Sequence, residues 1–572
     1  MSSLSKLPHY QKRQFISENI DLTSVETVKK FYTELIKINI TSTEQFEQWL
    51  LHRSELEAAL DQTGSILYIE MTCQTDDTEK ADAYKNFIEI ISPVTKPLND
   101  QLNQQYFKAL EQFPLDEQHY AVLTRATKAD IELFVEKNVE LQTKVELLSQ
   151  EYQTICGGMT VEFDGQERTL PEMGKFLLEP DRNLRERAWK ASAARRLKEK
   201  DKLDDIFDRM LHLRHTIAQN ADCQNFCEYK FRSLQRFDYT PEQCKEYHTT
   251  VEQIVLPLWK EILKKRQHNM KLDYLKPWDT AVDPLGREPL KPFEKVSELI
   301  NGCQKIFNHV DPQLGAQFQE MQDLGVLDLE SRKGKAPGGY QSTLNESRKP
   351  FIFMNAVGVD SDINTLLHEG GHAFHALACA HDSLLDYRHG PMEFCEVASM
   401  GMELLAGEYL SEFYNKEDAQ RSRMDHLEDA LSVLVWVATI DAFQHWIYEN
   451  PKHTASDRKK AWLDIHNRFS TGCINWGGQE EEHAYLWHRQ LHIFEVPFYY
   501  IEYGIAQLGA LQLWFNAKKD WDTALGQYRQ ALALGGSKPL PKLFETAGLQ
   551  FDFSEKTIKP IVEAVKKELN FS

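Results

Sequence analysis

Residues 365–376 read TLLHEGGHAFHA and contain the segment His368-Glu369-Gly370-Gly371-His372, around which the chain is organised. Two histidines four residues apart on a helix lie on one face, one turn apart. Both imidazoles can therefore reach one Zn²⁺, and the intervening glutamate can hold and deprotonate a water molecule. This H-E-x-x-H spacing is typical of zinc peptidases.

The residues around this motif predict a buried helix, because Leu366, Leu367, Ala373 and Phe374 are apolar. Two histidines and a glutamate are costly to bury unless they are satisfied. A metal ion would satisfy them. The alternative is an ordinary helix whose two histidines have hydrogen-bond partners.

His375 shares the face of His368 but lies two turns further on, roughly 10 Å along the axis, so one ion cannot bind both. The metzincin class of zinc peptidases carries glycine and histidine where this chain has His375 and Ala378, which excludes that class. The third ligand must therefore come from elsewhere in the chain.

Three glutamates follow in an apolar, helix-forming stretch, at Glu393, Glu396 and Glu403. One of them can complete a two-histidine, one-glutamate site that leaves a position open for water. A second can hydrogen-bond a ligating histidine from outside the ligand set. Spacing alone does not choose among them.

A second chemically rich block, residues 487–503, reads WHRQLHIFEVPFYYIEY. Peptide hydrolysis develops an oxyanion, which preorganised tyrosine hydroxyls or a neutral histidine stabilise. Tyr500 and Tyr503 are three residues apart and share a helix face. The alternative interpretation of this block is an aromatic core stripe.

Composition indicates a soluble globular protein: 42% of the 572 residues are hydrophobic and 27% are charged. The net charge of −21 argues against nucleic acid or an anionic membrane as a partner. Nine scattered cysteines form no disulfide or zinc-site pattern, and Met1–Phe15 has no apolar signal region. These features predict a cytoplasmic protein, and they leave the oligomeric state open.

The chain's length predicts at least two lobes. Helical periodicity runs through the first 155 residues, and residues 160–170 form a hairpin around Asp164-Gly165. We therefore place an N-terminal helical lobe at 1–180 and a catalytic helical region at 181–572. Residues 273–292 are a proline-rich loop.

A glycine-rich segment, 333–340, precedes an apolar run at 351–355 that reads as a strand leading into the zinc helix. Gly338 and Gly339 permit close backbone approach. An edge strand beside a peptidase zinc site can hold a substrate by main-chain hydrogen bonds. Gly338, Gly339 and Tyr340 are therefore candidate substrate-binding residues, and an ordinary glycine loop is the alternative.

With these segments identified, the sequence resembles the oligoendopeptidase F branch of the thimet oligopeptidase (Pz-peptidase) family. The matching segments occur in the family's order and span about residues 275–510. They are 275–279, 332–340, 351–355, 365–375, 394–399, 438–446 and 497–504.

The resemblance implies a mainly α fold, a two-lobed helical ellipsoid with a deep central channel and a short β-hairpin or small sheet near the zinc. The third ligand of the family falls on Glu396, beside His368 and His372, and Glu369 is its general base. The carbonyl-binding histidine and oxyanion tyrosines match His492, Tyr500 and Tyr503. Their spacing differs from that of thimet oligopeptidase, so Tyr499, which is also a candidate substrate-binding residue, can replace Tyr500.

The sequence thus predicts an endopeptidase that cleaves short unstructured peptides with one Zn²⁺ per chain. One rival is a zinc carboxypeptidase of similar helical build, in which Arg489 would bind the terminal carboxylate. Others are an inactive peptide-binding scaffold and a structural helical protein with incidental histidines. A two-histidine, one-glutamate site also accepts other divalent metals.

Overall fold

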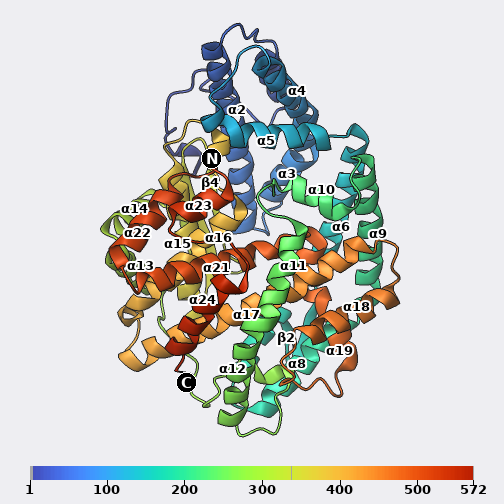
Figure 1. Ribbon diagram of the computed structural model, residues 1–572, viewed down its shortest axis with the longest axis vertical. Helices are drawn as coiled ribbons and strands as arrows, with labels where there is room; N and C mark the ends of the chain where they lie inside the picture. Colours follow the sequence, from blue (N-terminus) through green and yellow to red (C-terminus); the bar gives the residue numbers. More distant parts are fainter. Residues whose placement is uncertain (1–3, 337, 571–572) are drawn as a thin grey trace. The chain divides into compact units, whose positions relative to one another are not determined.

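The computed structural model describes residues 4–336 and 338–570, and it is mainly helical with two small sheets (Figure 1). The chain forms two compact units. Unit 1 comprises residues 1–134, 291–423 and 506–551, and unit 2 comprises 135–290, 424–505 and 552–572. The predicted mainly α class with a small sheet beside the H-E-x-x-H helix is confirmed. The predicted division at residue 180 stays a prediction.

Unit 1 contains most of the N-terminal helices and the segment with the H-E-x-x-H motif. Its helices are α1 (Val25–Ile36), α2 (Thr43–Cys73), α3 (Thr78–Asn86), α4 (Ser92–Leu110), α5 (Glu117–Leu133), α13 (Val296–Val310), α14 (Pro312–Leu324), α15 (Asp360–Cys379), α16 (Met392–Ala406), α22 (Trp521–Leu532) and α23 (Leu540–Thr546). Its short helical turns are η1 (Leu4–Lys6), η2 (Phe87–Ile91), η6 (Leu385–Tyr387) and η7 (Gly407–Glu412).

The N-terminal helices of unit 1 share one apolar core. Ser24 caps α1 by accepting a hydrogen bond from the Thr27 backbone. Phe46, Trp49 and Tyr106 are buried in this core, and the Trp49 indole donates to the Leu35 carbonyl at 3.1 Å. Helical spacing of these apolar residues therefore decides how α1, α2 and α4 pack.

A three-stranded sheet in unit 1 leads directly into the H-E-x-x-H helix. Its strands are β3 (Leu327–Glu330), β4 (Tyr340–Leu344) and β5 (Lys349–Ala356), in the order β3-β5-β4. Strand β5 pairs parallel with β3 and antiparallel with β4. It is buried along most of its length, which explains its continuous apolar run. The predicted strand at 351–355 is confirmed, and β4 lies at an edge of this sheet.

Unit 2 is built from the middle of the chain and two later segments. Its helices are α6 (Glu136–Gly157), α7 (Leu170–Met173), α8 (Arg182–Leu197), α9 (Lys200–Asn220), α10 (Phe226–Ser233), α11 (Pro241–Thr250), α12 (Leu256–Asn269), α18 (Ala455–Arg468), α19 (Glu480–Ala484), α20 (Leu491–Glu495) and α24 (Glu555–Glu568). Its short helical turns are η3 (Gly174–Leu177), η4 (Val251–Val255), η5 (Pro277–Asp279) and η8 (Leu486–Arg489).

Two long helices, α17 (Lys416–Glu449) and α21 (Tyr500–Ala517), each have residues in both units. By length and composition, α17 could cross a membrane, but 72% of its most apolar window is buried inside the protein. Buried core helices of soluble proteins pass the same test.

The predicted hairpin is confirmed in unit 2, where β1 (Thr160–Phe163) pairs antiparallel with β2 (Gln166–Thr169). Asp164 and Gly165 have φ angles of 50° and 76°, as the type I′ turn requires. Phe163 packs on Met173 and Ala188, which attaches the hairpin to α8.

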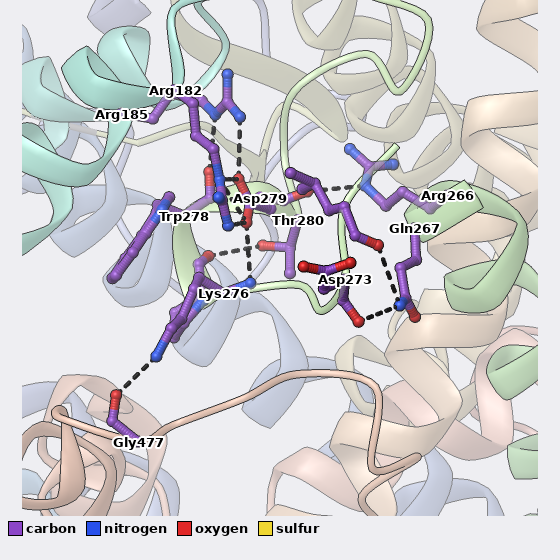
Figure 2. Close-up of polar contacts among 12 residues, drawn as sticks. Arg182, Arg185, Arg266, Gln267, Asp273, Lys276, Trp278, Asp279, Thr280 and Gly477 are labelled. Atoms are coloured by element: carbon purple, nitrogen blue, oxygen red, sulfur yellow. Dashed lines mark hydrogen bonds and ion pairs between the residues drawn. The ribbon is translucent and has the colours of Figure 1, made fainter. Parts of the chain in front are cut away.

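A buried carboxylate, Asp279, organises the loop at 273–292 in unit 2 (Figure 2). Its Oδ2 accepts from Arg182 at 2.7 Å, and its Oδ1 accepts from Arg185 at 3.0 Å. The Lys276 backbone also donates to it, at 2.9 Å. Burial by itself raises the pKa of Asp279, but these hydrogen bonds lower the pKa overall. The proline-rich loop is therefore held by charge as well as by packing.

We expect Asp279→Asn to lower the unfolding free energy by about 3–5 kcal/mol, because it leaves the buried Arg185 guanidinium without its counterion. Calorimetric thermal unfolding at pH 7 measures this change. At pH 7 the Asp279 carboxylate is ionised, so its full contribution to stability is present. Because folding lowers the pKa of Asp279, this contribution is lost only as the pH falls below about 3.9, the pKa of an unperturbed aspartate.

The matched control is Asp164→Asn, which removes an exposed ion pair with Arg187 and is expected to change stability by about 0–1 kcal/mol. Equal, small shifts for the two variants would contradict the role of Asp279.

Candidate metal centre

Helix α15 carries the motif, and a carboxylate cap sets where this helix begins. The Asp362 Oδ2 atom accepts from the backbones of Val357, Gly358 and Val359, at 2.8, 2.8 and 3.0 Å. These bonds turn the chain sharply between β5 and α15. An acidic group in the first turn also stabilises the helix dipole.

The two central glycines of the motif let α15 approach its neighbours closely. A Cβ on Gly371 would lie 2.6 Å from both the Ala398 carbonyl oxygen and the Ser399 Cα of α16. A Cβ on Gly370 would lie 2.7 Å from the Phe307 ring of α13. The Ala398 carbonyl also accepts from the buried Tyr528 hydroxyl at 2.7 Å. Backbone contact between α15 and α16 therefore brings residues 368–372 next to residue 396.

The three predicted ligands lie together. Glu396 Oε2 is 3.5 Å from His368 Nε2 and 3.7 Å from His372 Nε2. The three candidate donor atoms lie within 4.8 Å of one another. Tetrahedral zinc, with bonds of about 2.0–2.1 Å, places its donors roughly 3.3 Å apart. The donor set and its spacing therefore fit a zinc ion, whereas His375 is not part of this group.

Glu403, which the spacing left open, contacts a candidate ligand from outside. Its Oε1 atom lies 2.6 Å from His368 Nδ1. Such a bond orients the imidazole so that Nε2 faces the metal position. Glu396 is oriented in turn by the Ser399 hydroxyl, which donates to its Oε2 at 3.3 Å. Within the apolar stretch at 393–404, Glu396 therefore lies among the candidate ligands, whereas Glu403 supports one of them from outside.

The charges of this cluster shift its pKa values strongly. Burial favours neutral His368, but the hydrogen bond to Glu403 and the nearby carboxylates raise its pKa to about 9. Burial raises the pKa of Glu369 to about 7, assisted by Glu396 and Glu403 and opposed by His368. Burial also lowers the pKa of His372 well below its usual value. A cation held among these carboxylates would compensate their buried negative charge.

Strand β4 contacts the same site through its backbone. The Gln341 backbone hydrogen-bonds the Glu369 carboxylate, which lowers that group's pKa. A Cβ on Gly339 would lie 3.3 Å from the Thr365 side chain of α15. Sequence reasoning missed Gln341, because a side-chain pattern carries no signal for a backbone donor.

The other two predicted substrate-binding residues have partners within unit 1. The Gly338 carbonyl accepts from the Asn355 amide at 2.9 Å. The Tyr340 hydroxyl hydrogen-bonds Thr72, and its ring stacks on Phe353 with centroids 4.7 Å apart. These contacts position β4, and direct substrate binding by Gly338, Gly339 and Tyr340 stays a prediction.

His375 occupies a different environment from the two motif histidines. It is buried, its ring packs against Phe394, and burial lowers its pKa to about 3. Gly390 has no side chain where a Cβ would lie 2.9 Å from this ring. His375 is therefore a neutral core residue, in line with its exclusion from the predicted ligands.

The predicted oxyanion residues form a second group, in unit 2. The His492 ring lies 5.9, 4.9 and 5.7 Å from the rings of Tyr499, Tyr500 and Tyr503. Its Nδ1 atom is 2.8 Å from the Gln490 amide nitrogen, and its Nε2 atom is 3.5 Å from the Tyr503 hydroxyl. Burial lowers the pKa of His492 to about 4. This histidine is therefore neutral at physiological pH, and a neutral imidazole can still donate one N–H to an oxyanion.

Comparisons with known proteins cover nearly the whole chain. Residues 176–563 match Peptidase family M3, and residues 15–134 match the Peptidase M3 N-terminal domain. An oligoendopeptidase F homolog of Borreliella burgdorferi is 22% identical over 567 residues, covering 94% of this chain and 89% of that protein. The oligopeptidase PepF of Bacillus subtilis is 26% identical, covering 44% of this chain and 38% of that protein.

A solved structure, Pz peptidase A with an inhibitor, superimposes with a TM-score of 0.90 at 28% identity. The match covers 98% of this chain and 99% of that one. The likeness in fold therefore extends through both units, including the N-terminal helices, for which the sequence matched only in helical character.

We expect Gly371→Ala to separate α15 from α16 and to lower zinc affinity and thermal stability together, because a Cβ there meets backbone on both contacts. Zinc content after dialysis and thermal unfolding measure the two effects. Gly407→Ala is the control in unit 1, since a Cβ there has nothing within 4 Å. Unchanged zinc content in Gly371→Ala would contradict the packing argument.

Glu403→Gln is expected to lower zinc affinity about 10- to 100-fold, because the His368 imidazole loses its anionic partner. Competition with a chromogenic chelator measures the dissociation constant. Glu408→Gln, an exposed residue paired with Arg423 at 3.0 Å, is the control and should bind zinc as the parent does. Equal affinity in the two variants would show that Glu403 does not support the site.

Proposed function

The chain belongs to peptidase family M3, and on that premise we propose that it is a zinc-dependent oligoendopeptidase that hydrolyses internal bonds of short, unstructured peptides. His368, His372 and Glu396 would hold the ion. The observation that carries this proposal is the group of three donors within 4.8 Å of one another, with Glu369 on the same helix. A bound zinc ion would polarise a peptide carbonyl and lower the pKa of a water molecule.

Glu369 supplies the proton transfers. Its carboxylate accepts a proton from the attacking water as the oxygen forms a bond to the scissile carbonyl carbon. It then donates this proton to the departing amine nitrogen as the carbon–nitrogen bond breaks. A buried carboxylate whose pKa is raised toward 7 can act in both directions near neutral pH.

His492 and the tyrosines of unit 2 would serve the developing oxyanion. A neutral imidazole and phenolic hydroxyls donate hydrogen bonds without carrying charge into the site. The cluster of His492 with Tyr500 and Tyr503 supports this assignment, as does the lowered pKa of the histidine. Tyr499 lies in the same cluster, and the choice among the three tyrosines stays a prediction.

The edge position of β4 supports binding of extended peptides. An edge strand can pair with a substrate backbone irrespective of side chains. Such pairing would suit an enzyme that accepts many peptide sequences. We further propose a cytoplasmic location, based on nine cysteines that are scattered without disulfide spacing.

Glu369→Gln is expected to lower kcat for a quenched fluorescent peptide by at least about 10²–10⁴-fold while it retains zinc, because the amide cannot accept the proton. Metal analysis confirms the zinc content of the same sample. Glu330→Gln, an exposed residue at the end of β3, is the control and keeps full activity. A zinc-loaded Glu369→Gln enzyme with parental activity would overturn the mechanism.

Removal of the metal by a chelator is expected to abolish cleavage, and stoichiometric zinc to restore it. Mass spectrometry of the products separates the candidate functions. Internal cuts support the oligoendopeptidase, and stepwise loss of single C-terminal residues supports the carboxypeptidase.

A further inference from the structure

Unit 2 contains an aromatic cavity of about 320 Å³ that the proposed chemistry does not use. This volume is at the lower end of the range of about 300–1,000 Å³ for small-ligand sites. Among the described residues that line it, no side chain is a carboxylate and one, an arginine, is a cation. The residues used below are Trp189, Pro277, Thr280, Trp436, Trp476 and Arg489.

This cation is Arg489. Its guanidinium forms no hydrogen bond or ion pair with any of the described residues. Its one close partner is the Trp436 ring, whose centroid lies 5.4 Å from the guanidinium carbon. The residue is solvent-exposed, and the cavity that it lines is partly open to solvent. The desolvation and the nearby positive charge of Arg196 lower the pKa of Arg489 to about 10.

Part of the cavity wall belongs to the segment whose polar contacts Asp279 organises (Figure 2). Pro277 and Thr280 flank the residues that Asp279 fixes, and the Thr280 hydroxyl donates to the Pro277 carbonyl at 3.1 Å. Lys276 donates to the Gly477 carbonyl at 2.6 Å, which fixes the loop that carries Trp476. Trp189 lies between Trp278 and Trp476, with centroids 5.7 and 6.1 Å away. A preformed wall lowers the ordering cost of ligand binding.

The cavity is connected to the predicted oxyanion residues through Gln490. Its side-chain oxygen accepts from the Trp436 indole at 3.1 Å, and its nitrogen lies 2.8 Å from His492 Nδ1. Trp436 therefore contacts Arg489 on one side and the support of His492 on the other. A ligand that contacts Trp436 would therefore be linked to His492 through a single intervening residue, Gln490.

We propose that this cavity binds the C-terminal carboxylate of the peptide substrate, with the Arg489 guanidinium as its partner and the tryptophans around the last side chain. The inference rests on the proposed function, and it names the substrate class as peptides with a free C-terminus. Guanidinium binds a carboxylate through two parallel hydrogen bonds. The aromatic lining would bury an apolar terminal side chain.

An acidic side chain of the peptide carries a carboxylate, as the C-terminus does, and could also pair with the guanidinium. The experiment therefore uses three peptides of one uncharged core sequence: a free acid, its C-terminal amide, and an amide with an internal glutamate. Binding to zinc-loaded Glu369→Gln protein is measured by titration calorimetry, so that no peptide is hydrolysed. The readout does not need catalysis, and it remains informative if the peptidase proposal fails.

The free acid is expected to bind at least about tenfold more tightly than either amide, because only the acid pairs with the guanidinium. Adding Arg489→Gln should reduce this ratio to about one, and Arg489→Lys should retain part of it, since the charge remains without the planar fork. Arg187→Gln, an exposed arginine on α8 paired with Asp164 at 3.1 Å, is the control and should keep the full ratio.

Three results would overturn the proposal. They are equal affinity for acid and amide in the parent, an unchanged ratio in Arg489→Gln, and tight binding of the glutamate-containing amide. The last result would assign the cavity to an acidic side chain instead of the terminus.

Discussion

The backbone contact between α15 and α16 is the constraint on which the candidate metal centre depends. Only a residue without a Cβ fits at Gly371, because the Ala398 carbonyl and the Ser399 Cα occupy that space. The contact places Glu396 within 3.5–3.7 Å of two imidazoles that lie on another helix. A second contact explains the other variable position of the motif, since a Cβ on Gly370 would lie 2.7 Å from the Phe307 ring of α13. The residues that allow α15 and α16 to pack closely therefore also decide the geometry of the candidate ligands.

In both units, the buried charged groups described here have partners of opposite charge or hydrogen-bond donors, because an unpaired buried charge is costly. In unit 2, Asp279 binds two arginines and a backbone amide, and the result is a fixed loop. In unit 1, Glu396, Glu403 and Glu369 surround two histidines, and the raised pKa values of His368 and Glu369 show how strongly these groups interact. Arg489 is not covered by this rule, because it is solvent-exposed, and among the described residues its guanidinium has an aromatic neighbour and no bonded anion. An exposed guanidinium in an aromatic cavity is available to the ligand proposed above, whereas the paired charges hold the structure together.

Much of this protein could be predicted before its structure. The hairpin at 160–169 follows from Asp164-Gly165, whose positive φ angles few other residue pairs adopt. The strand β5 and the helix α15 follow from an apolar run, a turn and a helical period. The motif chemistry follows from the four-residue spacing of His368 and His372, because helix geometry is local. The family, confirmed over residues 176–563, could also be recognised from the order of its short motifs.

Tertiary structure decided what depends on residues distant in sequence. Spacing could not choose among Glu393, Glu396 and Glu403, because the choice depends on how α16 rotates against α15, and that rotation is decided by steric contact at Gly371. It could not find the Gln341 backbone donor, since every residue but proline has one. It offered Arg489 as a carboxylate ligand on residue type alone, and only the fold shows the aromatic cavity that this residue lines. The sequence by itself thus determined which residues carry the chemistry, because residue type and helical period are local properties. The fold decided which of them meet, because contacts between segments hundreds of residues apart depend on packing.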